Sequence, residues 1–227
     1  MKKTPDIVNL VADPYPPYQY NESGTVRGID HDIITAVFRE FKIETRVQLF
    51  PWEDCITLIE NKKADGIFQI VLTPERVSVF SFSRPLRTAG TVLYCTAGTS
   101  VEFDRDRDIK VQLEGYTLGA LAGYSYNPVI DSLKEPSKKE VDTQEMLLKG
   151  LLDGRFDLVV MDTGVETYLV DKMKVDSIVR VRGFEITREL HVAFQKNLIE
   201  LKDLFNSGLD KIKEKGIYKQ IFHKYGL

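Results

Sequence analysis

The stretch Gly66-Ile67-Phe68-Gln69-Ile70-Val71-Leu72 leads at once into Thr73-Pro74-Glu75-Arg76, and this junction is the clearest indication of the fold of the chain. The first seven residues are almost wholly apolar, as expected of a central strand that is covered on both faces. Thr73 is a favourable N-cap and Pro74 suits the first helical position, so a helical turn should begin directly after the strand. A buried strand that leads straight into a helix indicates a parallel sheet flanked by helices.

The residues before this stretch show the same alternation of strand and helix. A short β-rich run ends in the Pro/Tyr-rich segment 13–18, whose prolines forbid a helix and predict a rigid loop. Gly24 and Gly28 flank an expected hairpin-like turn, and Asp30 is a suitable N-cap for the helix after it. The apolar spacing predicts strands over Ile7–Ala12 and Thr45–Phe50 and helices over Asp30–Phe41 and Glu53–Asn61.

A second set of strands and helices follows, and an extended segment, Thr91–Thr96, leads into it. A second crossing is expected near Thr187–Leu190. This arrangement predicts an α/β protein with one lobe from residues 1–88 and 188–227 and another from residues 89–187. Strands are expected over Thr117–Leu121, up to Val141, and over Leu158–Met161, Ile178–Val181 and His191–Phe194, and helices over Glu145–Leu152, Thr163–Lys172 and Leu198–Lys215.

The charge pattern excludes some classes of partner. The chain has 31 Lys+Arg and 34 Asp+Glu residues, a net charge of -3, and no long run of either sign. It therefore lacks the basic footprint of a nucleic-acid-binding protein. No stretch approaches the roughly 18 apolar residues that cross a bilayer. The basic start Met1-Lys2-Lys3 is followed by polar residues, so the chain is either cytosolic or a mature form whose signal peptide was removed.

The cysteines and histidines do not predict a metal site. Cys55 and Cys95 are the only cysteines, and their neighbours lack ligand spacing. Two free, partly buried thiols are favoured over a disulfide. His31, His191 and His223 have no metal-ligand partner at helical spacing and are interpreted as structural, with His191 alone able to approach the hinge or the cleft. Neither a metal nor a cofactor is expected.

Six short motifs follow one another along almost the whole chain. They are the aromatic–proline loop Pro14–Tyr20, the G-I-D-x-D sequence Gly28–Asp32, the stretch Trp52–Gly66, the T-P-E-R and F-S segments in Thr73–Pro85, the strand Arg155–Asp162, and the ending Gly216–Gly226. Each is a weak signal alone, but in this order they resemble the family 3 extracellular solute-binding proteins, the polar amino-acid receptors of ABC importers. The resemblance implies a type II periplasmic-binding-protein fold, with hinge strands between two lobes.

The resemblance also implies a function. The chain is expected to bind a small solute, an amino acid or a related small carboxylate, in a cleft between the lobes. Hinge closure would hold the solute for delivery to an ABC transporter permease. The protein would be a periplasmic monomer, its signal peptide removed, without catalytic activity.

Two alternatives remain, because the same fold hosts several functions. One is the ligand-binding domain of a sensor or receptor. The other is a dehydratase of cyclic dienyl acids, which would need a positioned acid or base in the cleft. The available acids are Glu75, Asp162 and Glu166, and they do not form a recognisable catalytic pair.

Two charged residues are the main candidates for the site. Arg76 follows a strand end, where open α/β sheets bind ligands, and its guanidinium can form two parallel bonds with a carboxylate. The alternative is a surface arginine in the first turn of a helix. Asp162 ends an apolar strand and could accept the solute's ammonium, or cap the helix that follows, or do both.

The remaining candidates surround these charges. Tyr15, Tyr18 and Trp52 could form aromatic walls around the solute. The turn Gly123-Tyr124-Ser125-Tyr126 offers backbone N–H groups at a helix start for a carboxylate, although its tyrosines are bulkier than the small residues usual in the family. In the strand end Gln69-Ile70-Val71, Val71 has no hydroxyl for an ammonium, and Gln69 could take part of that role through its amide or carbonyl.

Overall fold

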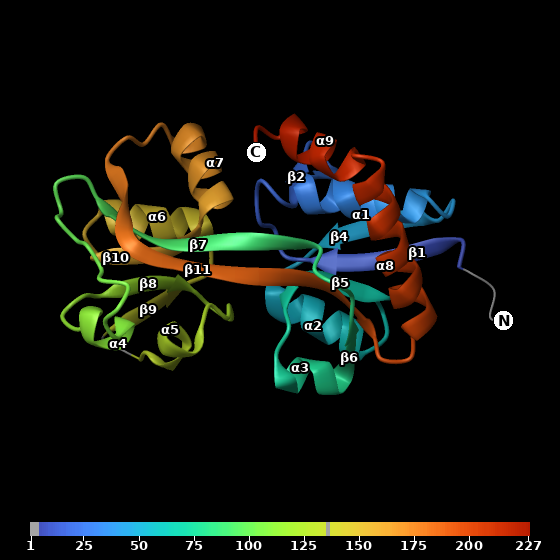
Figure 1. Ribbon diagram of the computed structural model, residues 1–227, viewed down its shortest axis with the longest axis horizontal. Coiled ribbons are helices and arrows are strands. Elements are labelled where there is room, and N and C mark those ends of the chain that lie inside the picture. The colour runs from blue at the N-terminus through green and yellow to red at the C-terminus, as the bar shows by residue number, and fades with distance from the viewer. Residues whose placement is uncertain (1–4, 135–136) are drawn as a thin grey trace. The chain divides into compact units, whose positions relative to one another are not determined.

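Strands and helices alternate along the computed structural model, which describes residues 5–134 and 137–227 (Figure 1). The strands are β1 Ile7–Ala12, β2 Tyr20–Glu22, β3 Thr25–Arg27, β4 Glu44–Leu49, β5 Gly66–Val71, β6 Phe80–Phe82, β7 Arg87–Thr96, β8 Leu118–Leu121, β9 Lys138–Val141, β10 Leu158–Asp162 and β11 Ile178–Gln195. The helices are α1 Ile29–Arg39, α2 Trp52–Glu60, α3 Pro74–Val79, α4 Ile109–Gln112, α5 Pro128–Ser132, α6 Gln144–Leu152, α7 Thr163–Met173, α8 Ile199–Glu214 and α9 Ile217–Lys224.

The chain divides into two compact units. The first contains the described residues up to Thr88 together with Glu189–Leu227, and the second is Ala89–Arg188. Strands β7 and β11 contribute residues to both. The prediction about a signal peptide concerns mainly Met1–Thr4, and these residues lie outside the described residues.

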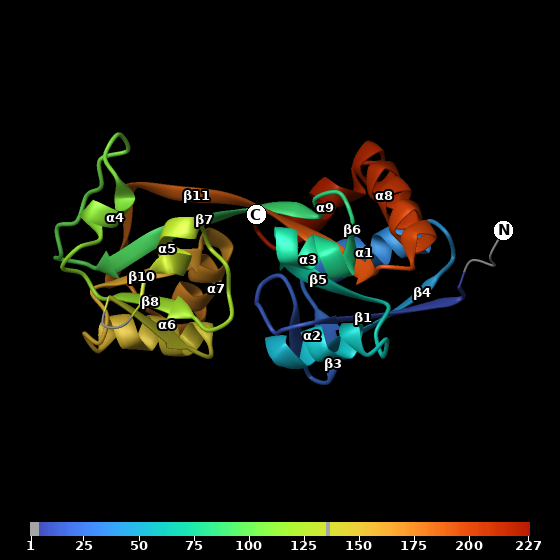
Figure 2. The same ribbon diagram turned by 90° about the horizontal axis from the view of Figure 1, so that it is seen from below.

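In the first unit, the strands follow the order β4-β1-β5-β11. β1 pairs in parallel with β4 and β5, and the last part of β11 pairs antiparallel with β5 and β6. Helices α1, α8 and α9 pack together on one face, and α2 lies on the other (Figures 1 and 2). The ends of β1 and β5 lead directly into the segments that carry the candidate site residues.

In the second unit, the order is β11-β7-β10-β8-β9. β8 pairs in parallel with β9 and β10, and β10 pairs antiparallel with β7. Helices α6 and α7 lie on one side of these strands, and α4 and α5 on the other (Figures 1 and 2). A hydrophobic cluster fills the latter side, where Tyr126 and Ile130 pack against strand residues such as Leu158 and Val160.

The structure confirms the expected strands and helices with small shifts at their ends, and it corrects three details. The strands expected over Ile178–Val181 and His191–Phe194, with a crossing between them, form the single strand β11. The short strand β6 was not expected. The third correction concerns Asp30, which does not cap α1, because the helix begins at Ile29 and Gly28 holds the N-cap position.

Asp30 instead lies in the first turn of α1 with no exposed surface, and it forms an ion pair with the buried Arg87. The Arg87 Nε atom lies 2.8 and 3.0 Å from the two carboxylate oxygens, and the guanidinium stacks on the ring of Tyr18. Gly28 makes this close packing possible, because a Cβ there would overlap the carbonyl oxygen of Tyr18. Its φ of 126° also lies in the region that favours glycine.

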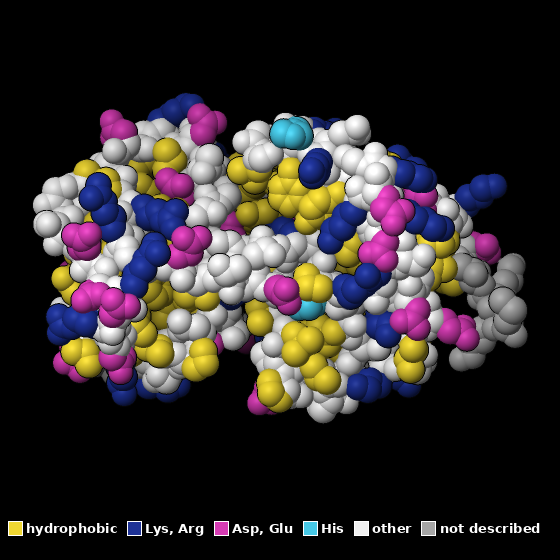
Figure 3. Space-filling model, in the orientation of Figure 1, with side chains coloured by type: hydrophobic (Ala, Val, Ile, Leu, Met, Phe, Trp, Pro, Cys, Tyr) yellow, Lys and Arg dark blue, Asp and Glu magenta, His cyan; other side chains and the backbone are white. Residues whose placement is uncertain are grey.

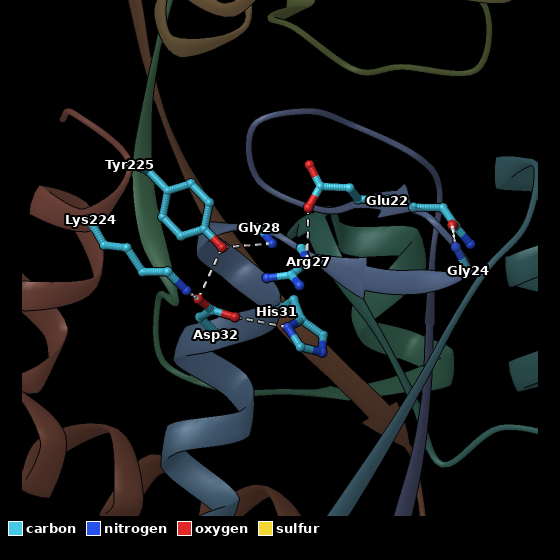
Figure 4. A network of polar contacts seen from close by, with 9 residues as sticks. Glu22, Gly24, Arg27, Gly28, His31, Asp32, Lys224 and Tyr225 are labelled. Carbon is cyan, nitrogen blue, oxygen red and sulfur yellow. Dashed lines mark hydrogen bonds and ion pairs between the residues drawn. The ribbon is translucent and has the colours of Figure 1, made fainter.

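A second polar network ties the end of the chain to α1 (Figure 4). The Asp32 carboxylate accepts bonds from Lys224 Nζ at 2.7 Å and Tyr225 Oη at 3.0 Å, and it contacts His31 Nδ1 at 3.0 Å. Tyr225 Oη also accepts a bond from the backbone N–H of Gly28. Burial opposes the charge on Asp32, but the bonds from His31, Lys224 and Tyr225 outweigh it and lower the pKa from 3.8 to about 2.

Replacing Asp32 with asparagine should therefore destabilise the protein in a pH-dependent way. The folded-state pKa of Asp32 is depressed, so its stabilising effect is complete above the unfolded pKa of about 4 and is lost as the pH falls through about 2. At pH 7 we expect Asp32→Asn to lower the free energy of unfolding by roughly 1–2 kcal/mol. Urea unfolding at several pH values measures this. A loss that persists unchanged at pH 2 would contradict it, and Asp203→Asn, at an exposed site in α8, serves as the control.

Both cysteines are free and buried, which confirms the favoured interpretation. Burial is the main reason that the pKa of Cys55 rises to about 12, and burial also raises the pKa of Cys95. Because the thiolate is the reactive form, neither thiol should react with a disulfide reagent in the folded protein at pH 8. We expect no labelling of the native chain and two labelled thiols after denaturation. Rapid labelling of the native protein would show that this prediction is wrong.

Among the described residues, none of the helices combines the length and apolar character needed to cross a membrane. Acidic and basic side chains are interspersed on the face shown in Figure 3, in agreement with the mixed charge pattern of the sequence.

Candidate functional site

Arg76 lies in α3, immediately beyond the end of β5. Thr73 caps this helix by accepting a bond from the Arg76 N–H, and Pro74 occupies the first turn, as the sequence predicted. The Arg76 Nη1 atom donates to the carbonyl oxygen of Val71 at 3.1 Å, and the guanidinium lies 5.4 Å from the ring centre of Trp52. These contacts fix the guanidinium beside an aromatic surface at a strand end.

The charge of Arg76 has no anionic partner within the described chain. Its guanidinium contacts a carbonyl oxygen and an aromatic ring, and its neighbour Glu75 is exposed. Burial is the largest influence on its pKa and lowers it, because a partly desolvated guanidinium loses favourable interactions with water. A carboxylate bound here would restore the missing interaction.

Gln69 has an unusual conformation in the middle of β5. Its φ of 58° lies in the left-handed region. The pairing with β11 shifts register beside it, because Phe68 and Ile70 pair with the consecutive residues Val192 and His191. The side chain is buried, and its amide oxygen accepts a bond from Gln19 Nε2. The amide oxygen is thus already used, and the amide N–H groups can only donate, which leaves the backbone carbonyl to accept a bond from an ammonium. Ile70 is fully buried, so only its backbone can take part.

Tyr15 and Tyr18 are only 3% and 5% exposed. Their rings lie nearly parallel, with centroids 6.1 Å apart, and Arg87 covers the Tyr18 ring. Tyr18 therefore supports the internal ion pair described above. Its role as a wall of the ligand site stays a prediction. The half-buried Trp52 already contacts the Arg76 guanidinium through its ring.

Asp13 is a buried carboxylate that the sequence interpretation missed. It directly follows β1, is 8% exposed, and accepts a bond from Gln19 Nε2 through its backbone oxygen. Its proximity also raises the pKa of Cys55. The available signal was its position, since it is the first polar residue after an apolar strand.

In the second unit, Asp162 ends β10 and caps α7. Its Oδ1 atom accepts bonds from the backbone N–H groups of Gly164 and Val165 at 2.9 and 3.4 Å. The capping alternative is thus confirmed, and the predicted ammonium contact stays a prediction. The side chain is 1% exposed.

Bonds within the chain already use part of the turn from Gly123 to Tyr126. Asp131 accepts bonds from Ser125 Oγ and from the Tyr126 N–H at 2.8 and 2.9 Å. The Tyr126 hydroxyl accepts a bond from Leu121 N–H, and its ring is in the hydrophobic cluster. An acidic residue of the protein therefore occupies part of the predicted carboxylate cradle. Tyr124 packs near Tyr126, with ring centroids 6.4 Å apart.

Arg188, which the sequence interpretation also missed, lies beside this turn. It donates to the Ser125 carbonyl oxygen at 2.5 Å and to Thr91 Oγ1 at 2.9 Å. It is 8% exposed. Sequence reasoning treated its segment only as a crossing between strands, so nothing marked it as a site residue.

Two other buried or partly buried titratable groups, Glu166 and His191, have polar neighbours within the chain. Burial raises the pKa of Glu166, whose carboxylate lies 3.5 Å from the Tyr94 hydroxyl. His191 is buried, and its Nδ1 atom is 2.9 Å from the Ser83 carbonyl oxygen. In residues 5–134 and 137–227, no group of three or more His, Cys, Asp or Glu side chains could hold a metal ion.

Residues 7–227 match the family described as bacterial extracellular solute-binding proteins, family 3. The probable amino-acid-binding protein YxeM of Bacillus subtilis (strain 168) is 28% identical over 221 residues, which cover 92% of this chain and 79% of that protein. The L-arginine-binding protein of Pseudomonas aeruginosa is 26% identical over 223 residues, which cover 93% of this chain and 84% of that protein.

Solved structures show the same fold. An ancestral arginine-binding protein bound to arginine superposes with a TM-score of 0.83 at 21% identity, covering 97% of this chain and 98% of that one. A histidine kinase sensor domain with similarity to periplasmic binding proteins gives a TM-score of 0.84 at 17% identity, covering 97% and 96%. The chain thus has the two-lobed fold of periplasmic binding proteins, and because both transport receptors and sensors use it, the fold does not separate these functions.

Proposed function

Because this chain belongs to the bacterial extracellular solute-binding proteins, family 3, we propose that it binds an amino acid and delivers it to an ABC transporter. The observation that carries this proposal is Arg76, a half-buried guanidinium at a strand end that has no anionic partner in the described chain and rests against Trp52. An α-carboxylate has the charge and the two-oxygen geometry that this fork binds best.

The relatives support the class of solute and do not name the solute of this chain. Among them are proteins named for arginine, histidine and cystine, each less than 30% identical. Relatives at this distance bind different amino acids, so the choice depends on this chain's own residues. Asp162 and the backbone around Gln69 are proposed as contacts for the ammonium group.

Calorimetry against the twenty amino acids tests the proposal. The protein should first be unfolded and refolded by dialysis, so that a solute carried through purification does not block the site. We expect at least one amino acid to bind with a 1:1 stoichiometry. If refolded protein with an intact unfolding transition binds none of the twenty, the amino-acid proposal is wrong.

We propose that the protein has no catalytic activity and acts outside the cytoplasm, in the periplasm, as a monomer. Turnover of prephenate and arogenate tests the enzyme alternative, for which Glu166 is a candidate acid because burial raises its pKa. Product formation that is lost in Glu166→Gln would favour the dehydratase. Closure of the units on the solute stays a prediction, and small-angle scattering with and without the bound amino acid would test it.

A further inference from the structure

Two adjacent hollows lie beside the first part of β11 in the second unit. Their volumes are about 460 and 450 Å³, and both are lined by Arg105 and Gly183. We call them together the arginine groove, because Arg105, Arg107, Arg180 and Arg182 line them. In Figure 3, basic side chains gather over this part of β11, with acidic ones beside them. All the lining residues belong to the second unit, so one unit forms the whole groove.

The loop between β7 and α4, which forms one wall of the groove, is held by Gln112. The Gln112 amide oxygen accepts a bond from the Asp104 N–H at 2.6 Å, and its amide nitrogen donates to the carbonyl oxygens of Asp104 and Arg107 at 2.9 and 3.0 Å. The start of the loop lies against β11, where a Cβ on Gly183 would overlap the carbonyl oxygen of Phe103. The loop is thus ordered before any partner binds, which lowers the entropic cost of binding.

Three arginines of the groove have no anionic partner in the part of the chain that the structure describes. Arg105, Arg107 and Arg182 are exposed, and none forms an ion pair or a side-chain hydrogen bond with a described residue. A free small anion would gain little here, because one exposed ion pair changes an equilibrium by no more than about fivefold. A segment that contacts all three guanidiniums and excludes water would gain much more.

The acidic residues of the same region do not neutralise the groove. Asp106 and Asp108 are not part of its lining, and Asp108 caps α4. Asp104 does line it, but its Oδ1 atom accepts a bond from the Asp106 N–H at 3.0 Å. Glu185 is paired with Arg180 at 2.8 Å. The groove therefore attracts anions, although the chain as a whole has a net charge of -3.

The groove also offers apolar contacts and the edge of a strand. Phe184 is 7% exposed, and it lines the groove together with the partly buried Ile109. Among the strands of the second unit, β11 lies at one end of the order, and the bridge between Glu102 and Arg182 beside it is an isolated one. Extended segments bind at such edges, where the side chains of alternate residues give specificity.

We propose that the arginine groove binds an acidic, extended segment of a partner protein. Alternate carboxylates of the segment pair with Arg105, Arg107 and Arg182, and its other side chains contact Phe184 and Ile109. Binding there needs neither the solute nor the first unit, so this inference stands or fails separately from the proposed function.

A short fluorescent peptide in which glutamate alternates with valine tests the proposal on the whole chain. Anisotropy should show binding that weakens as salt is added. The same peptide with glutamine in place of glutamate should bind at least about tenfold more weakly, since it loses several ion pairs. Equal binding of the two peptides, or binding of neither, overturns the inference. Displacement by citrate at the concentration at which unlabelled peptide displaces also overturns it, because the groove would then hold a small anion.

Charge reversals locate the contact. Arg105→Glu and Arg182→Glu should each lower the affinity for the glutamate peptide by about tenfold, because each replaces an attraction with a repulsion. The matched control is Arg155→Glu, the same change at an exposed position of the second unit outside the groove, and it should bind as wild type does. Thermal unfolding shows which variants are folded. If the folded groove variants bind as wild type does, or if the control loses as much affinity, the peptide does not bind in the groove.

Discussion

Replacing Arg76 with alanine should weaken amino-acid binding by about 100-fold and leave the fold intact. The side chain contributes one bond, to the Val71 carbonyl, and a ring contact with Trp52, so its removal costs the folded protein little. In the complex, truncating one partner of a desolvated charge pair leaves the other charge unpaired, which typically costs 2–5 kcal/mol. Every 1.4 kcal/mol is a factor of ten in affinity. Calorimetry with the amino acid that binds wild type most tightly measures the change.

Two further variants separate the geometry of Arg76 from its charge. Arg76→Lys keeps the charge without the planar fork, and its affinity should lie between those of wild type and the alanine variant. Arg46→Ala removes an exposed arginine of β4 that pairs with Glu44 in the same strand, and it should bind as wild type does. Undiminished binding by Arg76→Ala would remove the carboxylate contact from the proposed site.

The alternation of strands and helices could be predicted because its signals are local. The apolar run of β5 and the Thr73–Pro74 cap are formed by residues next to one another, and the structure confirms both. β11 escaped this reasoning, because the buried face of its middle part is interrupted by a charge. Phe184 and Leu190 are buried there, but the buried residue between them, Arg188, is charged and breaks the apolar alternation that predicts a strand.

The polar partners could not be predicted, since they depend on residues far apart in the sequence. Asp30 has the local signature of an N-cap, yet its partner Arg87 lies 57 positions away. Arg188 reaches Thr91 across 97 positions and Ser125 across 63. A sequence pattern shows that such a residue is charged and close to an element's end. Only the packing of the elements shows which charges are paired and which, like Arg76, have no anionic partner.

Replacing Asp30 with alanine should destabilise the protein by about 3–5 kcal/mol, a larger loss of stability than we expect from Asp32→Asn. Both side chains of the Asp30–Arg87 pair are essentially inaccessible to water, so the variant leaves the Arg87 guanidinium buried without its anion. Urea unfolding measures the change. Arg87→Ala should cost a similar amount, because it strands the carboxylate and also removes the cation from the Tyr18 ring.

The double variant and an exposed pair sharpen this test. Replacing both Asp30 and Arg87 with apolar residues should restore part of the lost stability, because the main cost of each single change is the unpaired buried charge. Asp210→Ala breaks the ion pair with Arg84, whose side chains are about half exposed, and it should cost less than about 1 kcal/mol. Equal small losses at both pairs would mean that the Asp30–Arg87 charges remain hydrated in solution. That result would contradict the explanation that Asp30 pairs with Arg87 because both charges are buried.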